Sequence, residues 1–168
     1  MLRMSALRLI AAAVVAAVPA ACSGDGTADN AATNPASEVP PVIKERQENF
    51  KAIGAAFKSV RGELESDAPD FALIAAKAGD INARAQQIPN DFPALTGIDE
   101  GYDTEALAAI WEKPEEFKAA AAKLADESAK LATIAGEGSK DAVAAQAMAI
   151  GGACKGCHDQ FRLDDEKK

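Results

Sequence analysis

The chain has 168 residues but only one histidine, one tryptophan and one tyrosine, and aromatic residues make up 5% of it. A single histidine excludes a multi-histidine metal site, and it excludes a catalytic triad supported by further histidines. Basic residues are also scarce, with 18 against 26 acidic ones and a formal net charge of −8. Because no run of Lys and Arg occurs, nucleic acid is a poor partner for this chain.

Hydrophobic residues make up 48% of the chain, and this length and apolar content suit one domain with a real core. Alanine is abundant, whereas valine, isoleucine, threonine and aromatic residues are sparse. That composition favours helices over sheets.

The first 21 residues have the pattern of a secretory signal peptide. Arg3 and Arg8 precede an apolar stretch over residues 9–18, and the small residues Ala20 and Ala21 follow it. A transmembrane helix needs about 20 apolar residues, so this stretch is too short to span a bilayer. We therefore expect export and cleavage after Ala20 or Ala21.

Cys22 directly follows the expected cleavage site and is a candidate for lipidation. Residues 22–41 form a segment rich in small and polar residues, which predicts a flexible linker. A lipidated cysteine followed by such a linker would tether the domain to a membrane in the periplasm. The alternative is an incidental thiol at the cleavage boundary, because Pro19 stands where a lipidation signal has leucine.

Four segments repeat apolar residues with the spacing of three and four that is typical of amphipathic helices. They cover residues 43–64, 71–88, 117–131 and 143–161. Pro114 suits the first turn of the third segment, Ser139 suits the N-cap of the fourth, and a short helix is expected over residues 107–111. Residues 42–168 are therefore predicted to form an all-α domain, an antiparallel four-helix bundle.

Arg46 is a charged residue on the otherwise apolar face of the first segment. An unpaired buried charge costs several kcal/mol, so a buried Arg46 needs a partner. The facing stripes offer no obvious carboxylate, and a bound anion would serve instead.

The chemistry is concentrated in residues 154–158, where Cys154, Cys157 and His158 form the Cys-x-x-Cys-His pattern of haem c attachment. Helix positions three apart point to one side, so both thiols can reach the two vinyl groups of one porphyrin. His158 is then placed to bind the iron as its axial ligand. The cofactor expected is one covalently attached haem c with its iron.

Three other functions for this pattern remain open. A thioredoxin-like pair has a strand before its helix, and none is expected here. A zinc site needs a second pair of ligands, which the domain lacks, and a structural disulfide would not require the adjacent histidine. A thiol-disulfide or zinc module is thus the remoter alternative.

The supply of iron ligands indicates a five-coordinate haem. Without the signal peptide, Met148 is the only methionine, and it lies about 15 Å before His158 along the same helix. Lys44 or Lys51 could bind iron only if deprotonated and turned inward. The alternative is a six-coordinate, low-spin electron carrier with an unforeseen ligand.

The strings C-K-G-C-H-D-Q-F-R at 154–162 and R-Q-E-N-F at 46–50 resemble those of the cytochrome c′ family, the class II c-type cytochromes. The resemblance implies a four-helix bundle with haem between the helices, often paired as a homodimer. It also implies a non-enzymatic protein that transfers electrons with periplasmic redox partners or binds the small gases NO and CO.

Three further site residues follow from the resemblance alone. Phe50 matches the position that carries Met in low-spin members and Leu or Phe in five-coordinate members. Arg46 matches the arginine that approaches a haem propionate, which would supply the missing anion. Arg162 matches an arginine beside the proximal ligand; otherwise it is a solvated residue favourable at a helix C-terminus.

Overall fold

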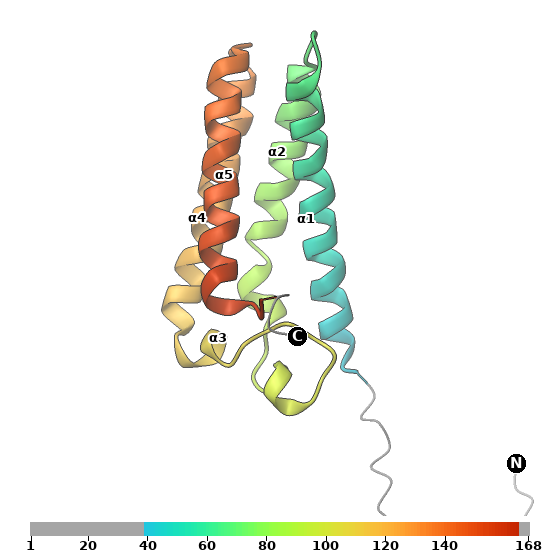
Figure 1. Ribbon diagram of the computed structural model, residues 1–168, viewed down its shortest axis with the longest axis vertical. Coiled ribbons are helices and arrows are strands. Elements are labelled where there is room, and N and C mark those ends of the chain that lie inside the picture. Colours follow the sequence, from blue (N-terminus) through green and yellow to red (C-terminus); the bar gives the residue numbers. More distant parts are fainter. Residues whose placement is uncertain (1–38, 165–168) are drawn as a thin grey trace, which may run out of the picture. The chain divides into compact units, whose positions relative to one another are not determined.

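The computed structural model describes residues 39–164, and in this part of the chain four long helices run side by side along one axis (Figure 1). They are α1 (Pro41–Glu65), α2 (Phe71–Ala85), α4 (Pro114–Ala135) and α5 (Lys140–Phe161). Two short 3-10 turns, η1 (Ile88–Asp91) and η2 (Ile98–Glu100), and the short helix α3 (Ala109–Glu112) lie in the connection between α2 and α4. The predicted all-α four-helix bundle is confirmed. The expected signal peptide and Cys22 lie outside the described residues.

The helix starts follow local chemistry. Both α1 and α4 begin with a proline, whose missing N–H costs nothing in a first turn. The Ser139 hydroxyl accepts a hydrogen bond from the Ala142 N–H at 3.3 Å and caps α5, while the Asp70 carboxylate caps α2 through the Leu73 N–H at 2.9 Å. The predicted roles of Pro114 and Ser139 are confirmed.

The second helix ends earlier than its apolar pattern predicts. The pattern runs to Ile88, but the α-helix ends at Ala85 and a 3-10 turn over Ile88–Asp91 follows. The residue before a proline is disfavoured in the α conformation, and Pro89 follows Ile88. Ile88 stays buried in the core even so.

The densest part of the core lies where α2 meets α4. The buried residues of α2 are Ile74, Ala78, Ile81 and Ala85, and those of α4 are Phe117, Ala121, Leu124, Ala125, Ser128, Leu131 and Ala135. Alanine at many of these positions lets the two backbones approach closely. The side-chain amide of Asn82 donates to the carbonyl of Ala125 at 2.7 Å, which joins the helices directly.

The end of α5 is attached to the long connection. The Leu107 N–H donates to the Phe161 carbonyl at 3.1 Å, and the Leu163 N–H donates to the Glu105 carbonyl at 2.8 Å. These bonds flank a single antiparallel bridge between Ala106 and Arg162. Within residues 39–164, no helix is both long and apolar enough to cross a membrane.

Candidate functional site

A cavity of about 820 Å³ opens between α1 and α5, with α4 forming part of its inner wall. This volume lies in the range of pockets that hold cofactors. Its lining is mainly apolar and includes every sequence-predicted site residue of the described chain: Arg46, Phe50, Cys154, Cys157, His158 and Arg162. We call it the lower cavity, because its lining includes Ala106 and Ile110, at the end of the bundle that carries α3.

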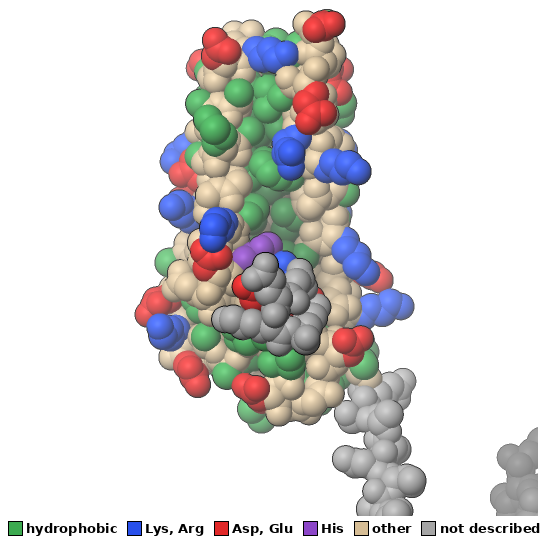
Figure 2. Space-filling model, viewed as in Figure 1, with side chains coloured by type: hydrophobic (Ala, Val, Ile, Leu, Met, Phe, Trp, Pro, Cys, Tyr) green, Lys and Arg blue, Asp and Glu red, His purple; other side chains and the backbone are tan. Residues whose placement is uncertain are grey.

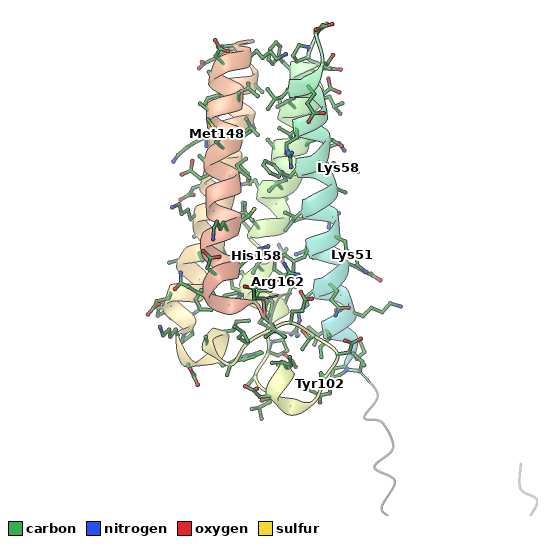
Figure 3. The ribbon with its side chains drawn as sticks, in the orientation of Figure 1. Lys51, Lys58, Tyr102, Met148, His158 and Arg162 are labelled. Carbon is green, nitrogen blue, oxygen red and sulfur yellow. The ribbon has the colours of Figure 1, made fainter. Side chains whose placement is uncertain are left out.

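Helix α5 supplies the two thiols and the imidazole. Cys154 and Cys157 are free thiols, half-buried against the core, and His158 is exposed one position farther along the helix. Figure 2 shows the histidine at the lower end of a groove lined by hydrophobic side chains, and Figure 3 places it on the α5 side of that groove. The three groups therefore face one space from one rigid helix.

Their protonation follows from this placement. Burial raises the pKa of the Cys154 thiol, and burial together with the neighbouring Cys154 raises the pKa of Cys157 to about 11. Burial of part of the ring, and then the charge of Arg162, lower the pKa of His158. At neutral pH both sulfurs keep their protons and the imidazole is neutral, which is the form that binds a metal.

A series of aromatic side chains closes one end of the lower cavity. Phe50, half-buried on α1, makes an edge-to-face contact with Phe92, with ring centroids 6.1 Å apart. The contacts continue from Phe92 to Phe117 at 4.9 Å and from Phe117 to Phe161 at 5.2 Å. Edge-to-face packing of this kind gives the end of the cavity a fixed, apolar shape.

Arg46 is 2% exposed, and neutral groups satisfy its charge. Its guanidinium donates to the Thr96 hydroxyl at 2.9 Å, to the Thr96 carbonyl at 2.6 Å and to the Thr104 hydroxyl at 2.8 Å. It also lies over the Phe92 ring, 4.6 Å from the centroid. Burial lowers the pKa of Arg46, and Asp91 partly opposes this. The expected need for a partner is confirmed, but these partners come from the connection after α2.

Sequence patterns missed Thr96 and Thr104 because both lie in the irregular connection, where no periodicity marks a buried residue. Gly97 is the one local indication of this contact, and its meaning depends on the three-dimensional structure. A side chain at Gly97 would place its Cβ 2.7 Å from the Trp111 ring, so glycine is required for the close approach that seats Thr96 next to Arg46.

Arg162 lies where α5 ends. Its side chain forms an ion pair with Glu105, and its N–H donates to the His158 carbonyl at 3.1 Å. Arg162 and His158 both line the lower cavity, and the charge of the guanidinium lowers the pKa of the imidazole. Arg162 is neither a fully solvated residue nor part of the buried wall.

Among residues 39–164, no group of three or more His, Cys, Asp and Glu side chains could hold a metal ion. Met148, 73% exposed, lines a different cavity from His158. An apolar slot with two thiols and one imidazole on one helix fits a flat porphyrin held covalently from that side.

Comparison with known proteins places the chain among haem proteins. The sequence model of the family described as Cytochrome C′ matches residues 41–162. The cytochrome c′ of Pararhodospirillum photometricum is 37% identical over 121 residues, which cover 71% of this chain and 94% of the relative. A cytochrome c-556 of Agrobacterium tumefaciens is 34% identical over 72% of this chain and 96% of its own.

Solved structures agree with these sequence relatives. The crystal structure of cytochrome c′ from Rubrivivax gelatinosus superimposes with a TM-score of 0.63 at 34% identity. The match covers 72% of this chain and 94% of that one.

Proposed function

Because the chain belongs to the cytochrome c′ family, we propose that it holds one haem c in the lower cavity and uses it for electron transfer and for binding of small gases. The observation that carries this proposal is the convergence of Cys154, Cys157 and His158 from α5 on a cavity closed by Phe50 on the α1 side. When bound, the haem supplies a one-electron iron couple and a coordination position for a small ligand.

The two cysteines attach the cofactor. Each thiol would add across one vinyl group, with sulfur bonding to one vinyl carbon and the thiol hydrogen passing to the other. The raised pKa values of Cys154 and Cys157 keep that hydrogen on sulfur beforehand. His158 would offer a neutral ring nitrogen to the iron, and attachment through Cys154 and Cys157 would fix the haem to α5.

Phe50 decides what can reach the other face of the iron. Its ring is held by Phe92, and Ile53, one turn later on α1, is buried beside it in the cavity wall. Neither side chain donates a hydrogen bond, which disfavours storage of dioxygen. Such a face excludes water and large ligands but admits NO or CO to a five-coordinate iron.

The two arginines have different roles in this proposal. Arg46 uses three of the five N–H groups of a guanidinium on Thr96 and Thr104, and Nε takes no part in those bonds. A haem propionate in the cavity would accept from it. Arg162, held by Glu105, lies beside the imidazole and would act on ligand binding from that side.

We further propose that the chain is exported to the periplasm, where it meets its redox partner proteins. The N-terminal sequence supports export, and Cys22 would carry the lipid that tethers the domain to a membrane. A homodimer formed through α1 and α2 is the pairing implied by the family resemblance.

The test is the absorption spectrum of the protein exported from a host that matures haem c. Oxidised, reduced and reduced, CO-treated samples are compared. A broad high-spin Soret band that sharpens with CO is expected. Sharp low-spin bands that do not change with CO would reject gas binding and support the alternative, a six-coordinate electron carrier. A colourless protein with two titratable thiols would overturn the proposal.

A further inference from the structure

A second cavity of about 400 Å³, which we call the upper cavity, opens between α1 and α5, nearer the end where α1 connects to α2 and α4 connects to α5. Its lining is mostly apolar and consists of Phe57, Arg61, Leu64, Glu65, Ala144, Ala147, Met148 and Gly151. Figure 2 shows hydrophobic side chains continuing from His158 along the groove between the two helices. We call the strip formed by this lining together with Lys51, Gly54, Lys58 and Cys154 the α1–α5 groove.

The α5 edge of the groove is unusually open to contact. Met148 is 73% exposed, although a large apolar side chain gains by burial. Ala144 and Gly151 flank it one turn away on either side, so little side-chain bulk separates the helix from an approaching surface. Flexible methionines beside small residues are typical of surfaces that bind other proteins.

The α1 edge is cationic. Lys51, Lys58 and Arg61 follow one another along α1 at helical spacing, and Figure 3 shows Lys51 and Lys58 across the groove from Met148 and His158. None of the three forms an ion pair in the described part of the chain. Six other cations there do: Lys77, Lys113, Lys118, Lys130, Lys155 and Arg162.

The acids beside the groove either lie at its ends or are paired with cations of their own. Glu65 lines the far end of the upper cavity. On the α5 edge, Asp159 is paired with Lys155 at 2.6 Å. At the loop end, Asp103 and Glu105 line the lower cavity, and Glu105 is paired with Arg162. The α1 edge therefore presents three cations that form no ion pair in the described part of a chain of net charge −8.

We propose that the α1–α5 groove is the docking surface for an acidic redox protein, whose carboxylates meet Lys51, Lys58 and Arg61 while an apolar contact covers Met148. This inference rests on the proposed electron transfer, because the groove runs past the haem-bearing face of α5. A row of like charge beside an apolar strip supplies both steering and short-range adhesion. Flavodoxin, an acidic redox protein, serves as the probe.

The first experiment maps the contact without using activity. The holoprotein and flavodoxin are treated with a carbodiimide, which joins lysine amines to carboxylates in direct contact, and the linked peptides are identified by mass spectrometry. Links from Lys51 and Lys58 are expected. Links confined to Lys77, Lys118 or Lys130, or no links at all, would overturn the proposal.

The same experiment separates a second copy of this chain from a foreign partner. Residues 91–116 hold eight acids and one lysine, so they are the chain's own candidate for contact with the cationic edge. Because Asp103 and Glu105 line the same cavity as Lys51, only links that join two chains into a covalent dimer count here. Such links from Lys51 or Lys58 to these acids would assign the groove to self-association and overturn the choice of an acidic redox partner.

The second experiment measures how fast flavodoxin hydroquinone reduces the oxidised holoprotein at several ionic strengths. The rate is expected to fall as salt rises. The variant K51Q/K58Q/R61Q should be about tenfold slower at low salt and nearly independent of salt. The matched control K77Q/K118Q/K130Q removes the same charge from α2 and α4 and should behave like the natural chain.

A rate that rises with salt in the natural chain, or a control as slow as the groove variant, would overturn the docking surface. A neutral ferrocene reagent separates this failure from that of the proposed function. If the protein exchanges electrons normally with ferrocene but is repelled by flavodoxin, only the proposed docking surface is rejected. If it exchanges electrons with neither reagent, the proposed electron transfer is rejected as well.

Discussion

Two pairs of facing helices in this bundle, α2 with α4 and α1 with α5, are packed differently. Between α2 and α4, small and medium apolar residues are fully buried, and Asn82 bonds directly to the opposite backbone. Between α1 and α5, two cavities separate the helices along most of their length. The α2–α4 pair is tightly packed, and the α1–α5 pair leaves the space in which we propose a cofactor and a docked partner.

The contrast is visible within a single helix. On α1, Ile43, Ala56 and Val60 are buried, whereas Phe57 and Leu64 are only half-buried beside the upper cavity. The first set lines neither cavity, whereas the second set lines the upper cavity. A helix can therefore contribute to the core with one stripe and to a binding surface with the next.

The largest effect is expected at the thiols. Replacement of both, C154A/C157A, should remove covalent haem completely, because the proposed attachment then has no sulfur. The mass of the denatured chain should fall by one haem relative to the natural chain. The single change Lys155→Ala, between the same cysteines, is the control and should retain the haem. Covalent haem in the double variant would contradict the attachment.

A matched pair of leucines tests the difference between the two interfaces. Leu131 is 0% exposed on α4, so Leu131→Ala should cost about 3 kcal/mol in the free energy of unfolding. Leu64→Ala, beside the upper cavity, should cost about 1 kcal/mol, because that side chain loses less contact. Urea unfolding of the two holoproteins measures both. Equal costs would show that the α1–α5 pair is packed as tightly as the α2–α4 pair.

Arg46→Gln should destabilise the domain by about 2 kcal/mol, because the Thr96 carbonyl and both threonine hydroxyls lose their charged donor. Thermal unfolding measures the change. Arg84→Gln is the control, since this arginine is exposed and its side chain donates to the Asn49 side chain at the surface. An Arg46 variant as stable as the control would mean that the guanidinium does not secure the connection.

The smallest effect is expected where α4 meets α5. The hydrogen bond from Gln146, followed by that from Lys130, lowers the pKa of Glu127. Because the pKa is lower in the folded state, the ionised Glu127 stabilises the fold at pH values above its ordinary pKa of 4.5. That stabilisation is lost as the pH falls and the carboxylate is protonated. In Gln146→Ala the free energy of unfolding should therefore fall less steeply below pH 4.5 than in the natural chain. An NMR titration of Glu127 that is unchanged in the variant would contradict the assignment.

Much of this fold could be predicted because its determinants are local. Spacings of three and four marked the helices, while Pro114 and Ser139 marked two of their starts. The motif at residues 154–158 is compact enough to be recognised without tertiary information. The structure places those residues together because a single helix carries them.

The remaining features depend on tertiary structure. Thr96 and Thr104 bond Arg46 across more than 49 positions of sequence, and no pattern in a loop announces such a contact. The apolar stripe of α1 reads as one continuous core face, so it conceals that Phe50 and Phe57 border an open groove. Which two helices are separated by cavities, here α1 and α5, depends on how all four helices pack in three dimensions.

The most direct test of this division is the reduced spectrum of Phe50→Met, read beside that of Phe50→Leu. If Phe50 covers the open side of an iron held by His158, a methionine there should bind the iron, give sharp low-spin bands and abolish the response to CO. The leucine variant should remain high-spin and bind CO. A methionine variant that stays high-spin and still binds CO would contradict the placement of haem between α1 and α5.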